Sequence, residues 1–294
     1  MCQHPRLILH MGSDSQFPLL SDQPLIPEPP TRPSYARRIQ RAHELSGRYP
    51  SAAELLRYYG RLAFSQQHIF DCLSGVALDS ANLWPLQIEL ILPLFADFAR
   101  GLAEISPALM RDRASALASA SLAEQENFLT RFWNGDSFQS SGDSPSPDHF
   151  VALAFLQPYA EWLAQSGHRI SAPTGHATCT VCGSEPVCSV LRDQDHGARR
   201  SLVCSLCMHE WSFLRVTCPA CGDERFESLP VFTPQEIPHI RIDACDTCHY
   251  YIKTIDMTKD GLAVPVVDEL ASISLDVWAA EKGYQKLVPN LAGL

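Results

Sequence analysis

Four Cys-x-x-Cys pairs in the second half of the chain constrain its fold more than any other feature. They contain eight of the eleven cysteines among the 294 residues. A two-residue gap lets both sulfurs of a pair face one ion, and a hairpin of about twenty residues can bring two pairs together around it. The predicted metal ligands are Cys179, Cys182, Cys204, Cys207, Cys218, Cys221, Cys245 and Cys248.

The four pairs belong to a tandem repeat. The third pair follows the first by 39 residues, and the fourth follows the second by 41 residues. This repeat predicts that the first pair shares an ion with the second, and the third with the fourth. The intervening segments predict strands near residues 186–193 and 199–204 in the first unit and near 239–245 and 250–257 in the second. We therefore expect two four-cysteine β modules of the rubredoxin or zinc-ribbon type.

The residue after the second cysteine of each pair bears on how tightly an ion is held. Gly183 and Gly222 follow the first and third pairs, where a left-handed backbone helps to close the loop. Met208 and His249 stand at this position after the second and fourth pairs, which we expect to loosen the sites slightly. We interpret His249 and the nearby His209 as exposed loop residues rather than ligands.

Three other uses of the cysteine pairs are less consistent with the sequence. Disulfides are rare in the cytoplasm, where we expect this protein to reside. A redox dithiol favours a strand, a CxxC pair and then a helix, whereas hairpins surround these pairs. Iron–sulfur clusters usually have a different and less regular cysteine spacing. Four thiolates suit either zinc or a rubredoxin-type iron, and the residues themselves leave both open, with zinc as the default.

The first half of the chain has a helical pattern after a proline-rich start. Capping boxes at Ser51–Glu54 and Ser121–Glu124 precede residues with helical apolar spacing. We count six or seven helices up to residue 167, and a further helix near the C-terminus whose apolar face includes Leu270 and Val277.

The predicted fold class is α+β with several domains: an N-terminal all-α helical bundle, two tandem four-cysteine β modules and a C-terminal helix. The predicted boundaries are 1–35 for an extended proline-rich arm, 36–170 for the helical domain, 176–216 and 217–262 for the two modules, and 263–294 for the C-terminal helix and tail.

The charge distribution argues against a nucleic-acid partner. The formal net charge is −10, and residues 176–256 contain seven lysines and arginines against eleven acidic residues. Proteins that neutralise phosphates need an excess of basic side chains. Arg192, Arg199 and Arg200 form a local basic cluster, which we interpret as the solvated face of a hairpin.

We find no sign of a membrane span or an active site in the sequence. The most apolar stretch, residues 83–99, is interrupted by Glu89, Asp97 and two prolines, so we expect it to stay out of a membrane. The N-terminus lacks the apolar run of a signal peptide, which favours the cytoplasm. Four cysteines close the coordination of a metal, whereas a catalytic metal keeps one position open. We therefore predict that the protein is not an enzyme.

Several segments together resemble the family of the formate dehydrogenase accessory protein FdhE. They are CTVCGSEPV, LVCSLCMHEWSFLRVTCPAC, DACDTCHYYIKTID and the terminal DELASISLDVWAAEKGY. The resemblance extends over nearly the whole chain. It departs at Thr180, where proline is common in the family, and at His249, where glycine is common, and neither residue is a predicted ligand.

The resemblance implies a cytoplasmic assembly factor that docks the molybdenum- and selenocysteine-containing catalytic subunit of formate dehydrogenase. It also implies rubredoxin-like sites with one iron each, so iron moves ahead of zinc on this ground alone. Motif positions are also matched by Glu210, Trp211, Arg215, Tyr251 and Lys253, which packing around the hairpins explains equally well. Two alternatives stay open: an iron redox protein or sensor, and a zinc ribbon that binds nucleic acid, which the acidic charge disfavours. The oligomeric state is not predicted.

Overall fold

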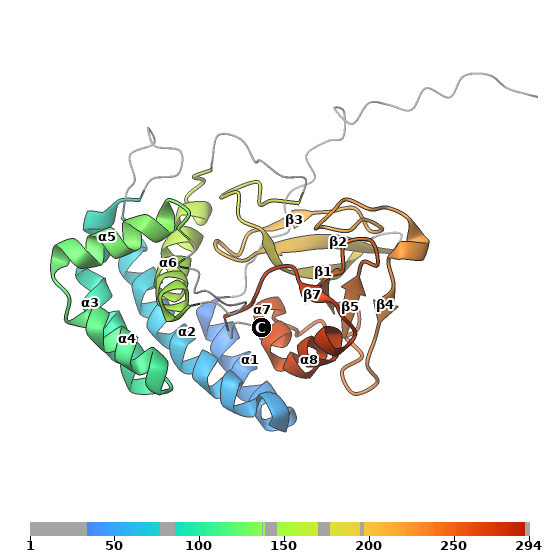
Figure 1. The fold of residues 1–294 in the computed structure, drawn as a ribbon, viewed down its shortest axis with the longest axis horizontal. Helices are drawn as coiled ribbons and strands as arrows, with labels where there is room; N and C mark the ends of the chain where they lie inside the picture. The colour runs from blue at the N-terminus through green and yellow to red at the C-terminus, as the bar shows by residue number, and fades with distance from the viewer. Residues whose placement is uncertain are drawn as a thin grey trace, which may run out of the picture. The chain divides into compact units, whose positions relative to one another are not determined.

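Helices occupy the first half of the chain and a sheet the second, in the predicted order (Figure 1). The computed structural model describes residues 34–76, 86–136, 138, 146–169, 177–194 and 197–291. Residues Thr31–Leu294 form one compact unit. The predicted proline-rich arm lies outside the described residues, apart from its last two positions.

Six α-helices precede the sheet in the part of the chain that the structure describes, which agrees with the predicted number. They are α1 (Tyr35–Arg48), α2 (Ala53–Leu73), α3 (Ile88–Ile105), α4 (Ala108–Ala118), α5 (Leu122–Trp133) and α6 (Pro147–Gln165), with a 3-10 turn, η1 (Pro50–Ala52), between the first two. Among the described residues, no helix combines the length and the apolar character needed to cross a membrane.

One of the two predicted capping boxes is present. The Ser121 hydroxyl accepts a hydrogen bond from the Glu124 backbone, and the Glu124 carboxylate accepts one from the Ser121 backbone. The prediction at Ser51 is wrong, because Pro50 begins a 3-10 turn that encloses Ser51, and α2 starts two residues later without a side-chain cap.

Helix α6 lies at the centre of the helical region. Its side chains from Phe150 to Leu163 are buried on nearly every face, whereas a surface helix buries one stripe. The ring of Phe155 meets that of Phe95 on α3 edge-on, with centroids 4.9 Å apart. Ala160 packs in the apolar cluster that includes three cysteines of the first repeat unit. Helix α6 thus connects the helical core to the sheet.

The strands of both repeat units belong to one sheet, which has seven strands in the described residues. They are β1 (Pro186–Gln194), β2 (Gly197–Cys204), β3 (Glu210–Ser212), β4 (Val231–Phe232), β5 (Ile240–Ala244), β6 (Tyr250–Asp256) and β7 (Gln285–Lys286). Their order is β3-β2-β1-β6-β5-β4, with β7 paired to β6. The two units meet where β1 and β6 pair in parallel, for example at Val190 and Ile255.

The predicted C-terminal helix is present as two short helices, α7 (Pro265–Ala271) and α8 (Ile273–Glu281). They are separated at Ser272, whose hydroxyl donates to backbone carbonyls of α7. Helix α7 contacts α1 and α2 as well as β1 and β6 (Figure 1). The break turns Val277 toward solvent, with 55% of its surface exposed, so its predicted place on the apolar face is wrong.

Buried ion pairs connect α1 to α6 and α7. Arg38 donates to both carboxylate oxygens of Glu161 at 2.8 Å, and Tyr35 donates to the same carboxylate at 2.9 Å. Arg41 donates to the two oxygens of Asp268 at 2.6 and 3.0 Å. Removing one partner of such a buried pair leaves an uncompensated charge, which makes the pairs important for how these helices are held together.

A second buried charge network fastens the sheet to the C-terminal helices. The Lys253 ammonium lies 2.8 Å from Glu269 and 2.6 Å from Asp276. Lys286 contacts the same two carboxylates, so positive and negative charges balance. Burial, the largest effect, lowers the pKa of Lys253, but the two carboxylates outweigh it and raise that pKa. The lysine therefore stays charged in the core.

Candidate metal centres

The structure brings the eight predicted cysteines together as two groups of four. In the first group, Cys179 and Cys182 precede β1, Cys204 ends β2, and Cys207 lies in the next turn. The Sγ atoms of Cys179 and Cys207 are 3.7 Å apart, and those of Cys182 and Cys204 are 3.3 Å apart. All four sulfurs lie within 4.8 Å of one another.

The second group repeats this arrangement. Cys218 and Cys221 lie in the loop before β4, Cys245 follows β5, and Cys248 precedes β6. The sulfurs of Cys218 and Cys248 are 3.7 Å apart, as are those of Cys221 and Cys245. The first pair of the chain thus shares a group with the second, and the third with the fourth.

The sulfur separations fit a tetrahedral metal site. Thiolates about 2.3 Å from an ion at tetrahedral angles are about 3.8 Å apart, close to the 3.3 and 3.7 Å measured here. Disulfide sulfurs are about 2.05 Å apart, and the ten cysteines of the described residues are all free. Zinc and iron both accept four thiolates, so the donor set suits either metal.

All four cysteine loops have the same backbone shape, although only two contain the expected glycine. Gly183 and Gly222 have φ angles of 78° and 77°, and Met208 and His249 adopt the same left-handed region at 55° and 60°. In the first, third and fourth loops, the N–H of this residue donates to the carbonyl of the first cysteine at 2.8–2.9 Å. A side chain at such a position costs about 1–2 kcal/mol of strain. Met208 and His249 therefore adopt the same loop shape as the two glycines, at a cost in stability.

Substitutions at these positions are expected to change the free energy of unfolding in opposite directions. Gly222→Ala places a Cβ in the left-handed region and should lower it by about 1 kcal/mol. His249→Gly should raise it by up to about 1 kcal/mol, because the side chain is exposed and strain is relieved. Met208→Gly is the contrast: Met208 is buried in the core, so lost packing outweighs the relief. Thermal denaturation of the metal-loaded protein tests all three, and a stabilising Gly222→Ala would contradict the backbone argument.

The two histidines next to the cysteines differ in environment. His249 is exposed, as predicted. His209 is only 5% exposed, so its interpretation as an exposed loop residue is wrong. Its ring lies parallel to that of Trp211, with centroids 6.4 Å apart, and its carbonyl accepts from the Cys204 N–H at 2.9 Å. This hydrogen bond closes the turn that contains the second cysteine pair, and the His209 side chain is buried beside it.

The interpretation of the basic cluster as a solvated hairpin face is wrong for Arg200. This side chain is buried, because β2 lies between β1 and β3 and the loop after β3 covers it. Its guanidinium donates to the Ser189 hydroxyl at 3.0 Å and to the Thr217 carbonyl at 2.9 Å. Arg200 thus anchors the loop that leads into Cys218. Arg192 is paired with Glu210 and remains partly exposed.

Burial and mutual contacts shift the pKa values of the thiols. Contact with Cys179 is the largest effect that lowers the pKa of Cys182. Burial raises the pKa of Cys204 and of Cys207, and in the second group it raises the pKa of Cys218 to about 11. Only the deprotonated sulfur is a metal ligand, so an ion that binds here displaces protons and its affinity falls as the pH falls.

The two groups differ in their access to solvent. Cys179, Cys204 and Cys207 of the first group are each 0% exposed. They pack with Ala160 of α6 in one apolar cluster, so this group is part of the protein core. In the second group, Cys221 is exposed.

We expect a chelator to remove two bound ions in separate phases. The second group, whose Cys221 is exposed, should lose its ion at least about tenfold faster than the first, because three of the four sulfurs of the first are enclosed in the core. Release of zinc from zinc-loaded protein to a coloured chelator measures both rates. The Cys218→Ser, Cys221→Ser double variant should show the slow phase alone, and a single phase for the wild type would contradict the assignment.

A third cluster of possible ligands was not predicted from the sequence. One ligand atom each from His239, Asp260 and Asp268 lies within 4.8 Å of the others. The guanidinium of Arg41 contacts both carboxylates at 2.6 Å and supplies the positive charge there. Arg41 is more than 200 residues from Asp260 and Asp268 in the chain, and no sequence motif predicts such a contact.

Comparison with known proteins agrees with this architecture. A model of the FdhE central domain matches residues 178–215, and a model of the FdhE C-terminal domain matches residues 216–292. An FdhE homolog from Aquifex aeolicus is 29% identical over 271 residues, which are 87% of this chain and 94% of that protein. An FdhE homolog from Shewanella oneidensis is 38% identical over 112 residues, which are 38% of this chain and 37% of that protein.

The similarity extends to the three-dimensional structure and includes the helical region. The crystal structure of the FdhE protein from Pseudomonas aeruginosa has a TM-score of 0.68 and 25% sequence identity to this chain. It covers 89% of this chain, and the match spans 96% of that one. The two domain models follow each other in the order of the two cysteine groups. The chain therefore belongs to the FdhE family.

Proposed function

We propose that this protein is a cytoplasmic accessory factor that assists the maturation of formate dehydrogenase by docking the enzyme's catalytic subunit. Its membership in the FdhE family supports this role, because the resemblance to that family implies an accessory protein of formate dehydrogenase. The observation that carries the proposal is the pair of four-cysteine groups in one sheet. Each group can surround an ion completely, which suits a structural module rather than a reaction centre.

The eight cysteines would hold one ion per group, iron by family resemblance and zinc as the alternative. Bound metal supplies folding free energy to segments that contain little regular structure of their own. Residues 213–230, for example, contain only a short 3-10 turn among loops, and Cys218 and Cys221 lie within them. An ion in the second group would fix the shape of this surface for a partner.

Capture of the formate dehydrogenase catalytic subunit tests the proposal. Tagged protein is purified from anaerobically grown cells of the same organism, beside the Cys218→Ser, Cys221→Ser double variant. We expect the wild type to retain the subunit and the variant to lose most of it, because the surface around the second group loses its ion. Cys72→Ser, a substitution of an exposed cysteine outside both groups, is the matched control and should retain the subunit.

The outcomes separate folding from docking. Metal content and circular dichroism of each preparation show whether the variant stays folded with one ion. Failure of the folded, metal-loaded wild type to retain the subunit would contradict the assembly role.

A redox role is the second candidate, and the exposure of Cys221 favours it. Electron exchange with a partner requires a short path from the metal to the surface, which the exposed Cys221 of the second group offers, whereas every cysteine of the first group is buried or half-buried. The test is an anaerobic titration of the iron-loaded protein with dithionite and ferricyanide, followed by absorbance. Zinc alone in protein from iron-replete cells would rule this role out.

A further inference from the structure

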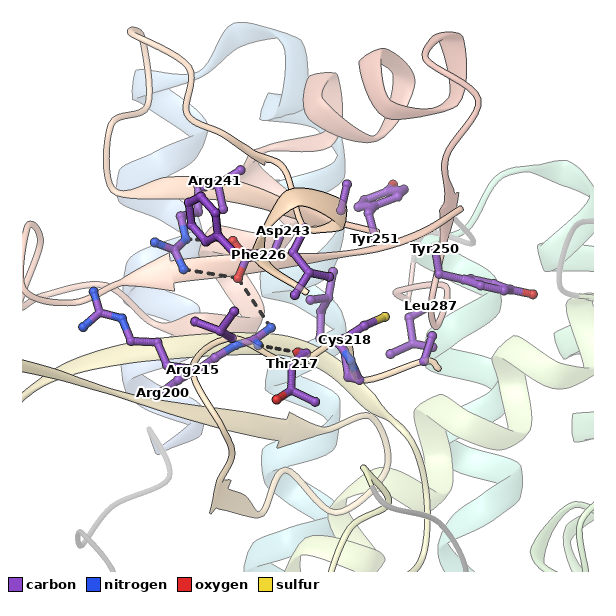
Figure 2. A pocket seen from close by; sticks show the side chains of 17 residues that line it. Arg200, Arg215, Thr217, Cys218, Phe226, Arg241, Asp243, Tyr250, Tyr251 and Leu287 are labelled. Carbon is purple, nitrogen blue, oxygen red and sulfur yellow. Dashed lines mark hydrogen bonds and ion pairs between the residues drawn. The ribbon is translucent and has the colours of Figure 1, made fainter. Parts of the chain in front are cut away.

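A pocket of about 180 Å³ adjoins the second four-cysteine group. Its walls come from the loop that leads from β3 to Cys218 and from strands β4, β5 and β6 (Figure 2). Cys218 itself contributes to the lining. An ion held by the second group would therefore fix one wall of the pocket, while the rest of the pocket is independent of the cysteines.

Most of the charged side chains that line the pocket are arginines, in a protein whose net charge is −10. Its lining contains Arg200, Arg215 and Arg241 and one acidic residue, Asp243. Figure 2 shows Asp243 between Arg241 and Arg200, and its carboxylate lies 2.8 Å from the first guanidinium and 3.4 Å from the second. One carboxylate thus forms ion pairs with two arginines, and it also accepts a hydrogen bond from the Thr254 hydroxyl at 2.7 Å.

The three arginines have different roles in this lining. Arg200 is committed to the fold, because it donates to the carbonyls of Leu214 and Thr217. Arg241 shares Asp243 with it. Arg215 is exposed and has no carboxylate within 4.0 Å among the described residues. Arg215 and part of the charge of Arg241 therefore remain available to an anionic group.

The rim of the pocket is apolar and exposed. Phe226 is 77% exposed, Val231 is 51% exposed and Val216 is 45% exposed, and all three line the pocket. Leu214, which is 63% exposed, belongs to the same loop. Exposed large apolar side chains that gather around a concave site are typical of a surface that binds another molecule. Together with the arginines, they define a site for a group that is both anionic and apolar.

We propose that this pocket docks an acidic segment of a partner protein in which one carboxylate side chain stands between apolar side chains. Arg215 and Arg241 receive the carboxylate, and Phe226, Val231 and Val216 cover its apolar neighbours. Arginine suits this task because its planar guanidinium matches a carboxylate with two hydrogen bonds. The identity of this partner, the catalytic subunit of formate dehydrogenase, rests on the proposed function.

The test uses two variants with matched controls on the helical region. Arg215→Glu reverses the available charge, and Phe226→Asp removes the apolar wall. Arg61→Glu and Phe64→Asp make the same changes at exposed positions of α2, where Phe64 is 70% exposed. We expect each pocket variant to lower retention of the catalytic subunit at least about tenfold, and each control to leave it unchanged. All four should keep both metal ions, because no cysteine is altered.

Direct titration with a peptide separates this inference from the proposed function. The probe is acetyl-Leu-Phe-Glu-Leu amide, and the same peptide with glutamine in place of glutamate is its control. We expect calorimetry to detect binding of the glutamate peptide to the wild type. The glutamate peptide should bind Arg215→Glu at least about tenfold more weakly, and the glutamine peptide should bind the wild type at least about tenfold more weakly. If the wild type retains the subunit and the pocket variants retain it equally, the pocket is overturned while the proposed function stands. If the wild type retains no subunit, selective peptide binding supports the pocket alone, and lack of such binding overturns it.

Discussion

Replacement of Cys207 by serine is expected to remove the ion of the first group and to destabilise the protein by more than about 4 kcal/mol. Cys207 is 0% exposed and packs in the cluster that joins α6 to the sheet. Loss of the ion would leave the buried Cys179 and Cys204 and the half-buried Cys182 without the cation that holds them as thiolates, at the point where the helical core meets the sheet. For a chain of this size, the midpoint of thermal unfolding should fall by about 10 °C or more.

Two other serine substitutions distinguish metal loss from the loss of a buried thiol. Cys188 is also 0% exposed but lies outside both groups, so Cys188→Ser should keep two ions and lose less stability than Cys207→Ser. Cys221→Ser alters an exposed cysteine of the second group and should remove one ion with a smaller loss of stability. Calorimetry and metal analysis of the three variants give the comparison. Retention of both ions by Cys207→Ser would show that the first group is not a metal site.

The second large effect is expected at the buried pair of Arg38 and Glu161. The side chains are 3% and 2% exposed, and they join α1 to α6 through two hydrogen bonds of 2.8 Å. Arg38→Met should lower the free energy of unfolding by about 3–5 kcal/mol, because it leaves the Glu161 carboxylate buried without the guanidinium that balances its charge.

The double variant Arg38→Met, Glu161→Gln should recover part of this loss, since it removes both charges. Urea denaturation of the wild type, both single variants and the double variant gives the coupling free energy between the two side chains. An expected coupling of at least about 2 kcal/mol reflects the buried environment, in contrast with exposed pairs, which are worth about 0–1 kcal/mol. Additive effects would show that the two side chains act independently.

The cysteine groups could be predicted from the sequence because they depend on short-range geometry. Two cysteines three positions apart share a loop, and a hairpin such as the one formed by β1 and β2 brings the next pair alongside. The strands of the two units were also expected, because their alternating residues repeat in both. The left-handed backbone at Met208 and His249 was not expected, because neither residue favours that conformation and the closed loop imposes it.

Features that depend on packing between distant elements were not predicted. The parallel pairing of β1 with β6 joins segments more than 60 residues apart, and nothing in either strand specifies it. His209 and Arg200 were expected near solvent because they are polar, but their burial is set by the neighbouring strands and the loop after β3. The single C-terminal helix was expected from an apolar pattern that continues past Ser272, where the helix breaks.

The contrast between the two cysteine groups has a consequence for the proposed function. The first group is built into the core between α6 and the sheet, so an ion there would stabilise the fold as a whole. The second includes the exposed Cys221 and borders the arginine-lined pocket. We infer that an ion in the second group would shape the surface that meets the partner.

The number of metal ions per folded chain tests the central claim most directly. Native mass spectrometry of anaerobically purified protein should give two ions per chain. The Cys179→Ser, Cys182→Ser variant and the Cys218→Ser, Cys221→Ser variant should each hold one ion less. A folded wild type with no ion, or with its eight cysteines joined as disulfides, would contradict the assignment of these groups as metal sites and the docking role that depends on them.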